Sequence, residues 1–230
     1  MFPFICFVES VAKLPAPVVT SRILHLPQSS GYGKTRLCFE VLKYENCGIY
    51  CVFRSNKEGY PGTTSWMSSL MVKFRESKSD EEAILLCMDF IKESIKNFSN
   101  FGETERAKKI LALFEGKIEN AISTSFDLNS KSTDSIENEI KTILDESGRK
   151  VFPIIFDECH ELLVLPYSSS STGGGPRISL YRALRRALMR LKHFKIVAVF
   201  LGTKSSLDDF VLNSRRDPST RLAGDDPESE

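Results

Sequence analysis

The spacing of hydrophobic residues changes several times along the chain, and each change marks an expected element. Short apolar runs rich in β-branched residues predict strands, and they cover residues 18–26, 49–53, 151–156 and 196–201. Between the second and third runs the apolar residues recur every three or four positions, which is typical of amphipathic helices. One stripe contains Ile84, Met88, Ile91 and Ile95, a second Ile110, Phe114, Ile118 and Ile122, and a third Ile136, Ile140 and Ile143.

Two more helices are expected, at 36–44 after the first strand and at 177–192 before the last one. Strands that alternate with helices in this way favour an α/β fold with a mainly parallel sheet. The run at 151–156 is typical of a strand buried on both faces, although Pro153 cannot donate a hydrogen bond to a neighbouring strand. The expected organisation is an N-terminal lead-in at 1–17, one domain at 18–213 with a helical insertion at about 65–147, and a polar, disordered tail at 214–230.

Composition favours a soluble globular protein and excludes some classes of function. Of the 230 residues, 41% are apolar and 27% are charged, and the net charge of +1 argues against a protein built around attraction to nucleic acid or acidic membranes. The first eight residues lack the basic region of a signal peptide, and no apolar run approaches the roughly 20 residues of a membrane helix. The six cysteines form no CxxC pair, so we expect an intracellular protein of the cytoplasm or nucleus with reduced cysteines.

The strongest chemical signal is the segment Gln-Ser-Ser-Gly-Tyr-Gly-Lys-Thr at 28–35, between the first strand and the following helix. A loop in this position directs backbone N–H groups and the positive end of the helix dipole at a phosphate. Lys34 would reach the terminal phosphates and Thr35 would bind magnesium, whereas Gln28 departs from the glycine of the usual pattern. The expected nucleotide-binding residues are Ser29, Ser30, Gly31, Tyr32, Gly33, Lys34, Thr35 and Arg36. The alternative is a chance Gly-Lys-Thr on a surface turn.

An acidic pair directly follows the third apolar run. The end of that strand would place Asp157 beside the phosphate loop, where it would hold magnesium together with Thr35. Glu158 would act as general base toward the attacking water, while Lys34 stabilises the transferred charge. Alone, Asp-Glu after a strand is more often a solvated turn. The phosphate loop about 120 residues earlier favours the catalytic interpretation.

Polar residues after the fourth apolar run offer another catalytic candidate. In P-loop ATPases with a catalytic glutamate, the corresponding strand lies between the phosphate-loop strand and the acidic strand. A polar residue at its tip senses the γ-phosphate. Thr203 is the candidate and Ser205 the second choice, with a plain turn as the alternative.

The helix expected at 177–192 carries Arg182, Arg186 and Arg190 at four-residue spacing. Such a stripe could supply an arginine finger to a neighbouring subunit or contact nucleic acid. We favour a solvated face on which the arginine stems cover apolar surface.

Three segments together resemble the ATPase domain of fungal and oomycete Crinkler-type effectors, a group near the AAA and STAND branches of P-loop ATPases. They are the phosphate-loop segment at 28–37, Asp-Glu-Cys-His-Glu-Leu at 157–162 and Phe-Leu-Gly-Thr-Lys-Ser-Ser at 200–206. The resemblance spans roughly residues 18–222. It implies a P-loop NTPase three-layer sandwich with a helical insertion that binds ATP and Mg²⁺.

The sequence therefore predicts an ATP-binding P-loop NTPase whose magnesium-dependent hydrolysis drives a conformational or effector role. One alternative is a nucleotide-binding switch that acts through protein partners without hydrolysis. Another is a truncated relic of a Crinkler-type effector. The expected ligand is a nucleotide, with a protein partner or self-association as further candidates. We expect no membrane and no main role for nucleic acid.

Overall fold

Four parallel strands form the centre of the structure, a computed structural model that describes residues 2–13, 22–27, 33–45, 48–53, 65–99, 132–147, 151–163 and 178–202. The strands lie in the order β1-β4-β3-β2. Their bounds are Ile23–Pro27 for β1, Ile49–Val52 for β2, Phe152–Asp157 for β3 and Ile196–Gly202 for β4. All four apolar runs are confirmed as strands, and β4 lies between β1 and β3 as expected.

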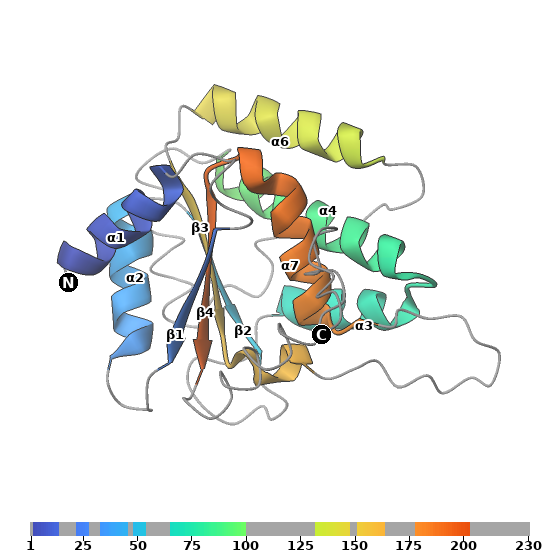
Figure 1. Cartoon of the computed structure of the whole chain (residues 1–230), viewed down its shortest axis with the longest axis horizontal. Helices are drawn as coiled ribbons and strands as arrows, with labels where there is room; N and C mark the ends of the chain where they lie inside the picture. Colours follow the sequence, from blue (N-terminus) through green and yellow to red (C-terminus); the bar gives the residue numbers. More distant parts are fainter. Residues whose placement is uncertain are drawn as a thin grey trace, which may run out of the picture.

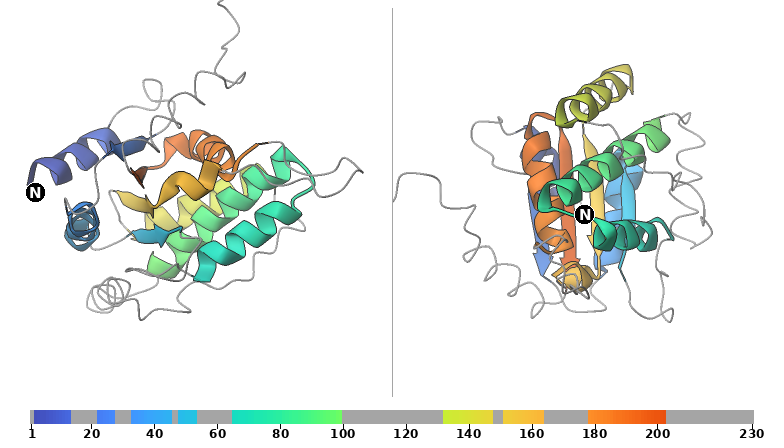
Figure 2. Two further views of the ribbon diagram at one scale, coloured as in Figure 1. Left: turned by 90° about the horizontal axis from the view of Figure 1, so that it is seen from below. Right: turned by 90° about the vertical axis from the view of Figure 1, so that its right-hand side faces the viewer.

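Helices cover both faces of this sheet (Figure 1). α1 and α2 lie on one face, α7, α4 and α3 lie on the other, and α6 packs against α4 (Figure 2). The helix bounds are Phe2–Lys13 for α1, Lys34–Glu45 for α2, Ser65–Glu76 for α3, Asp80–Ser99 for α4, Thr133–Ser147 for α6 and Leu180–Arg190 for α7. Two short 3₁₀ helices, η1 (Cys159–Leu163) and η2 (Leu191–His193), follow β3 and α7. The α/β class with a parallel sheet is thereby confirmed, whereas the apolar stripe at 110–122 lies outside the described residues.

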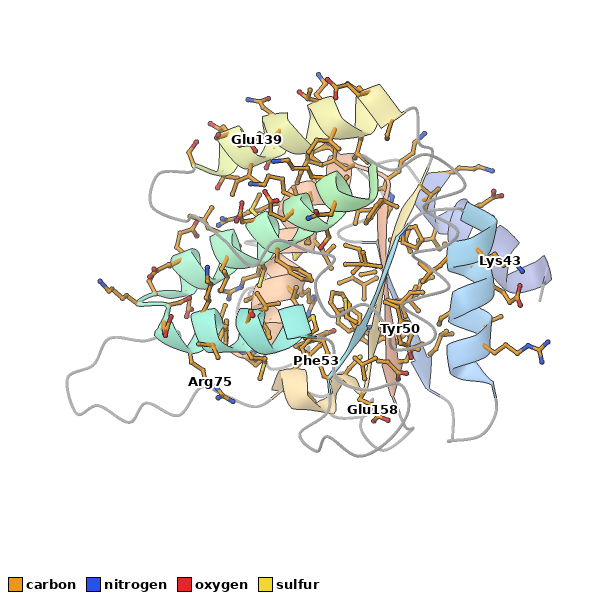
Figure 3. All side chains as sticks on the ribbon, turned by 180° about the vertical axis from the view of Figure 1, so that it is seen from behind. Lys43, Tyr50, Phe53, Arg75, Glu139 and Glu158 are labelled. Atoms are coloured by element: carbon orange, nitrogen blue, oxygen red, sulfur yellow. The ribbon has the colours of Figure 1, made fainter. Side chains whose placement is uncertain are left out.

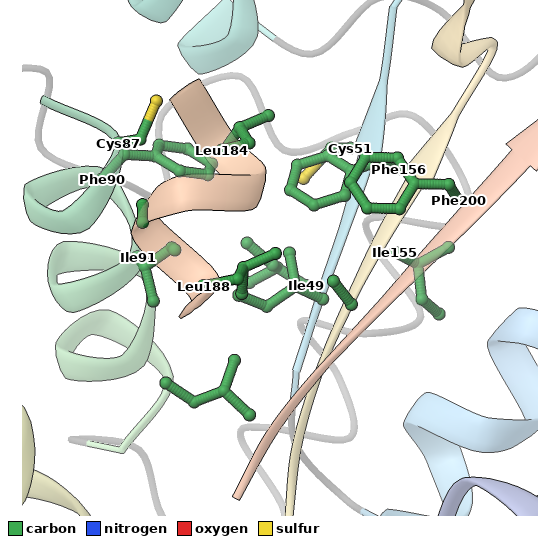
Figure 4. Close-up of a cluster of buried hydrophobic side chains, with 14 of the residues drawn as sticks. Ile49, Cys51, Cys87, Phe90, Ile91, Ile155, Phe156, Leu184, Leu188 and Phe200 are labelled. Carbon is green, nitrogen blue, oxygen red and sulfur yellow. The ribbon is translucent and has the colours of Figure 1, made fainter. Parts of the chain in front are cut away.

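The sheet face that carries α7 and α4 holds a large part of the apolar core (Figure 4). Phe156 and Phe200 stack with ring centroids 4.9 Å apart, and the buried Leu184 and Leu188 belong to α7, which lies between the sheet and α4. Both inner strands are buried over their whole length. The stripe of Ile84, Met88, Ile91 and Ile95 is also buried, so its expected role as core is confirmed.

A close approach between β2 and β3 explains how Pro153 fits inside the sheet. Phe152 donates its N–H to the β4 side, so the nitrogen of Pro153 faces β2. The β2 ladder begins with Ile49 opposite Ile154, which means that Pro153 precedes it and needs no donor there. Gly48 has φ +106°, and a Cβ added to it would lie 2.4 Å from the carbonyl oxygen of Pro153. This position therefore requires glycine.

The N-terminal lead-in contains α1, a helix that the pattern of apolar residues did not indicate. Pro3 lies in its first turn, where backbone N–H groups have no partner within a helix, so the proline is compatible with it. Val8 and Ala12, one turn apart, are buried, and α1 contacts β4. The apolar start of the chain is thus part of the folded domain.

The arginine stripe docks α7 on α4. Arg190 makes two hydrogen bonds to the carboxylate of Glu81, at 2.6 and 2.7 Å, and Arg186 lies 3.8 Å from Asp80. Both carboxylates belong to the first turn of α4, where the helix dipole also favours negative charge. α7 begins at Leu180 instead of 177, and its N-cap is Ser179. Arg186 and Arg190 thus keep the partial exposure expected of a solvated face, and in addition they form ion pairs between two helices that the sequence did not predict.

Candidate active site

All four strands end at the same edge of the sheet because all of them are parallel. α2 begins at this edge, at the end of the strands marked by the arrowheads in Figure 1. Gly33 precedes α2 with φ +76°, and Leu37 donates its N–H to the carbonyl oxygen of Gly33 at 2.9 Å to close the first turn. The carboxyl edge of a parallel sheet, with a helix N-terminus beside it, is the usual place for a ligand in open α/β folds.

The structure covers only part of the expected phosphate loop. Lys34 and Thr35 form the start of α2, with side chains outside the described part, and Arg36 is exposed. The expected nucleotide-binding residues Ser29, Ser30, Gly31 and Tyr32, together with Gln28, lie outside the described residues. The same is true of Thr203 and Ser205, which follow directly after the end of β4. The backbone at Gly33 and the start of α2 agree with the expected strand–loop–helix arrangement.

Asp157 ends β3, is only 7% exposed, and has both carboxylate oxygens engaged. The hydroxyl of Tyr50 donates a hydrogen bond to Oδ2. The backbone N–H of Glu158 donates to Oδ1 at 2.9 Å. Sequence reasoning missed Tyr50, although the alternation of side chains along the run at 49–53 could have indicated which of its residues share a face.

Alternation along the strands shows which face of the sheet carries Asp157. The side chains of Pro153 and Asp157 lie on the same face of the sheet, since every second side chain of a strand points the same way. A Cβ added at Gly48 would meet both Pro153 Cγ and Leu42 Cδ2 at 2.7 Å, and Leu42 belongs to α2. Asp157 therefore lies on the sheet face covered by α2, the helix that starts with Lys34.

Glu158 has a left-handed backbone conformation, with φ +57°, and is half-buried. Such a conformation is costly for any residue with a Cβ, by about 1–2 kcal/mol. Figure 3 shows Glu158 and Tyr50 near the same end of the sheet, while Lys43 lies farther up α2. Strained backbone of this kind collects at functional sites, where the surrounding structure holds it in place.

Cys159 supports the turn that follows the acidic pair. Its thiol is buried and donates to the carbonyl oxygen of Phe156 at 2.8 Å. Burial and the nearby charge of Asp157 raise the pKa of the Cys159 thiol, so it stays protonated. Cys38, Cys51 and Cys87 are also free and buried, which confirms the expected role of these four cysteines as reduced core residues. The side chain of the adjacent His160 lies outside the described part.

Arg190 of the arginine stripe lies far from the acidic pair. α7 ends just before β4 begins, so Arg190 lies at the amino edge of the sheet, opposite to Asp157. Within the described ranges, no group of three or more His, Cys, Asp or Glu side chains could hold a metal ion by itself. No helix in that part of the chain is long and apolar enough to span a bilayer.

Residues 19–227 match the profile of a protein family that is described as a domain of unknown function, DUF8735. The chain belongs to this family. No curated protein and no solved structure matches it. The DUF8735 domain thus brings the start of α2, Tyr50, Asp157 and Glu158 to one edge of its sheet, and the function has to be inferred from that arrangement.

Proposed function

We propose that this DUF8735 domain is a P-loop NTPase that binds ATP with magnesium and hydrolyses it. One observation carries the proposal: the N-terminus of α2 and the pair Asp157-Glu158 meet at one edge of a sheet with β4 between β1 and β3. This is the strand arrangement expected for P-loop ATPases with a catalytic glutamate. The sequence resemblance to the ATPase domain of Crinkler-type effectors supports the same class.

The phosphates would bind at the start of α2. N–H groups of the first turn have no carbonyl partner within a helix, and they point out of its N-terminus together with the positive end of the dipole. Lys34 is the first residue of α2, so its ammonium group starts from the position that a phosphate-binding lysine needs. Gly33, with its positive φ, provides the turn into the helix.

The chemistry of Asp157 fits the expected magnesium site. Mg²⁺ takes oxygen ligands and keeps several of its waters, so a site beside the phosphates needs few protein ligands. Each carboxylate oxygen has two lone pairs, so the hydrogen bonds from Tyr50 and Glu158 leave capacity for a metal-bound water. Thr35 would provide the second protein oxygen. Bound magnesium would neutralise charge on the phosphate oxygens during transfer.

Glu158 would position the attacking water and accept its proton. Glu158 follows the last residue of β3, and its left-handed backbone ends the regular alternation of the strand at Asp157. Two neighbouring carboxylates can then have different duties, one toward the metal and one toward the water. Thr203 would contact the γ-phosphate from the end of β4.

Calorimetric titration of ATP, with and without Mg²⁺, tests the proposal directly. We expect Mg²⁺ to strengthen binding in the wild type and Lys34→Ala to abolish binding while leaving the thermal unfolding unchanged. Lys43→Ala is the matched control, because Lys43 is an exposed lysine in the last turn of the same helix. Equal ATP affinity of Lys34→Ala and Lys43→Ala would refute the phosphate-loop assignment.

Single-turnover hydrolysis separates an ATPase from the alternative nucleotide switch. With enzyme in excess over labelled ATP, we expect phosphate release by the wild type and none by Glu158→Gln, which keeps binding. Tight Mg²⁺-dependent binding without any turnover would identify a switch that works through its partners.

A further inference from the structure

A buried tyrosine on β2 reaches the proposed metal ligand. Tyr50 is 1% exposed, and its hydroxyl donates a hydrogen bond to Oδ2 of Asp157. Val52 is the register partner of Asp157, and Tyr50 precedes Val52 by two residues, so all three side chains lie on the same sheet face. Diagonal neighbours on a sheet lie about 7–8 Å apart, within reach of an aromatic side chain. The register thus places Tyr50 on the right face and within reach of Asp157, and the hydrogen bond shows that it points there.

The two hydrogen bonds to Asp157 fix the rotation of its carboxylate. Oδ1 is held by the backbone N–H of Glu158 and Oδ2 by the hydroxyl of Tyr50. A carboxylate with only one of these bonds can turn about its last side-chain torsion, which is broad and has no sharp minimum. With both hydrogen bonds in place, the carboxylate cannot turn, and its remaining lone pairs point in a fixed direction.

We propose that Tyr50 is a positioning residue that holds the Asp157 carboxylate in the orientation required by nucleotide-bound magnesium. The inference rests on the proposed function. It adds a residue of β2 to a site built from α2 and β3. Removing such a partner behind a metal ligand lowers metal affinity by about 10- to 100-fold in known sites.

The test is the Mg²⁺ dependence of ATP binding in Tyr50→Phe, which keeps the ring and removes the hydroxyl. We expect the affinity for Mg²⁺ at the nucleotide complex to fall about 10-fold, with ATP affinity in the absence of Mg²⁺ unchanged. The matched control is Tyr181→Phe. Tyr181 is also buried, but its hydroxyl lies 3.3 Å from Nε2 of His25, on the opposite face of the sheet. This control should bind Mg²⁺ as the wild type does.

A double-mutant cycle distinguishes positioning from a general loss of structure. In the background of Asp157→Asn, adding Tyr50→Phe should change Mg²⁺ affinity no further, because the hydroxyl acts only through that carboxylate. An equal loss in both backgrounds, or a loss of ATP affinity without Mg²⁺, would overturn the inference.

The failure of each proposal has its own signature. A wild type whose ATP affinity does not respond to Mg²⁺, and does not depend on Lys34, overturns the proposed function together with this inference. A wild type that responds to Mg²⁺, with Tyr50→Phe indistinguishable from it, overturns only the role of Tyr50.

A ring-fluorinated tyrosine at position 50 covers the case in which Tyr50→Phe does not fold. It keeps the ring and the hydroxyl, and its ¹⁹F resonance reports on the Asp157 contact. The resonance should shift when Mg²⁺ is added to the ATP complex, and the same label at Tyr181 should not respond. An unchanged resonance at position 50 would overturn the positioning role of Tyr50.

Discussion

Replacing Glu158 by glycine should stabilise the fold relative to alanine at the same position, which is the reverse of the usual order. At φ +57° the backbone of a residue with a Cβ is strained by about 1–2 kcal/mol, and glycine, which has no Cβ, avoids this strain. Glycine in turn loses about 0.5–1 kcal/mol through its freedom in the unfolded chain. Glu158→Gly should therefore exceed Glu158→Ala by about 0.5–1 kcal/mol in the free energy of unfolding. The hydrogen bond from the residue 158 backbone N–H to Asp157 remains in both variants.

Urea unfolding followed by circular dichroism measures this difference, with Lys141 as the control position. Lys141 is exposed within α6, where glycine is about 1 kcal/mol less favourable than alanine. The order of the two variants should therefore reverse between positions 158 and 141. Phosphate release should fall by about 10²–10⁴-fold in both variants at 158, as expected on loss of a general base. Glu158→Gly no more stable than Glu158→Ala would refute the strain argument, and full activity in either would refute the catalytic role.

Three more outcomes follow from other contacts. Gly48→Ala should lower the free energy of unfolding by about 3 kcal/mol, measured by urea unfolding, because its Cβ meets the Pro153 carbonyl at a positive φ. Burial and the charge of Arg185 lower the pKa of His25, so the unfolded chain takes up the proton first and stability falls as pH drops below about 6.5. His25→Gln should flatten this pH dependence of the free energy of unfolding. Arg190→Gln should lower the free energy of unfolding by about 1 kcal/mol or less, measured by thermal unfolding, and leave ATP hydrolysis unchanged. A large loss of turnover would instead support the arginine-finger hypothesis.

The sheet could be predicted from the sequence because its signals are local. Each strand is a short apolar run, and β4 and the part of β3 before Asp157 lack charged residues because both faces are covered. The position of α2 followed from the glycine-rich segment and the helical spacing after it. Asp157 and Glu158 were predictable for the same reason, since they interrupt an apolar run at its end.

Features that depend on contacts between distant segments could not be predicted. The partner of Tyr50 depends on the register between β2 and β3, which no local pattern specifies. Lys92 looks like any solvated helix lysine in the sequence, yet it is 1% exposed and lies 2.5 Å from Asp89 and 3.5 Å from Glu139 of α6. α1 could not be predicted because its apolar residues form a continuous run at the start of the helix, without the three- and four-residue spacing of a helix face.

The order of the strands has a consequence for how the chain is made. β1 pairs with β4, with Ile23 opposite Ala198, and Arg22 before it donates to the carbonyl oxygens of Lys192 and Phe194. A ribosome adds about 5–20 residues per second, so β1 waits roughly 9–35 s for its partner strand to be synthesised. Until β4 is synthesised, β1 lacks its partner in the sheet and the proposed phosphate-binding edge is incomplete. A nucleotide that binds as proposed would therefore stabilise only the completed domain and not its early folding.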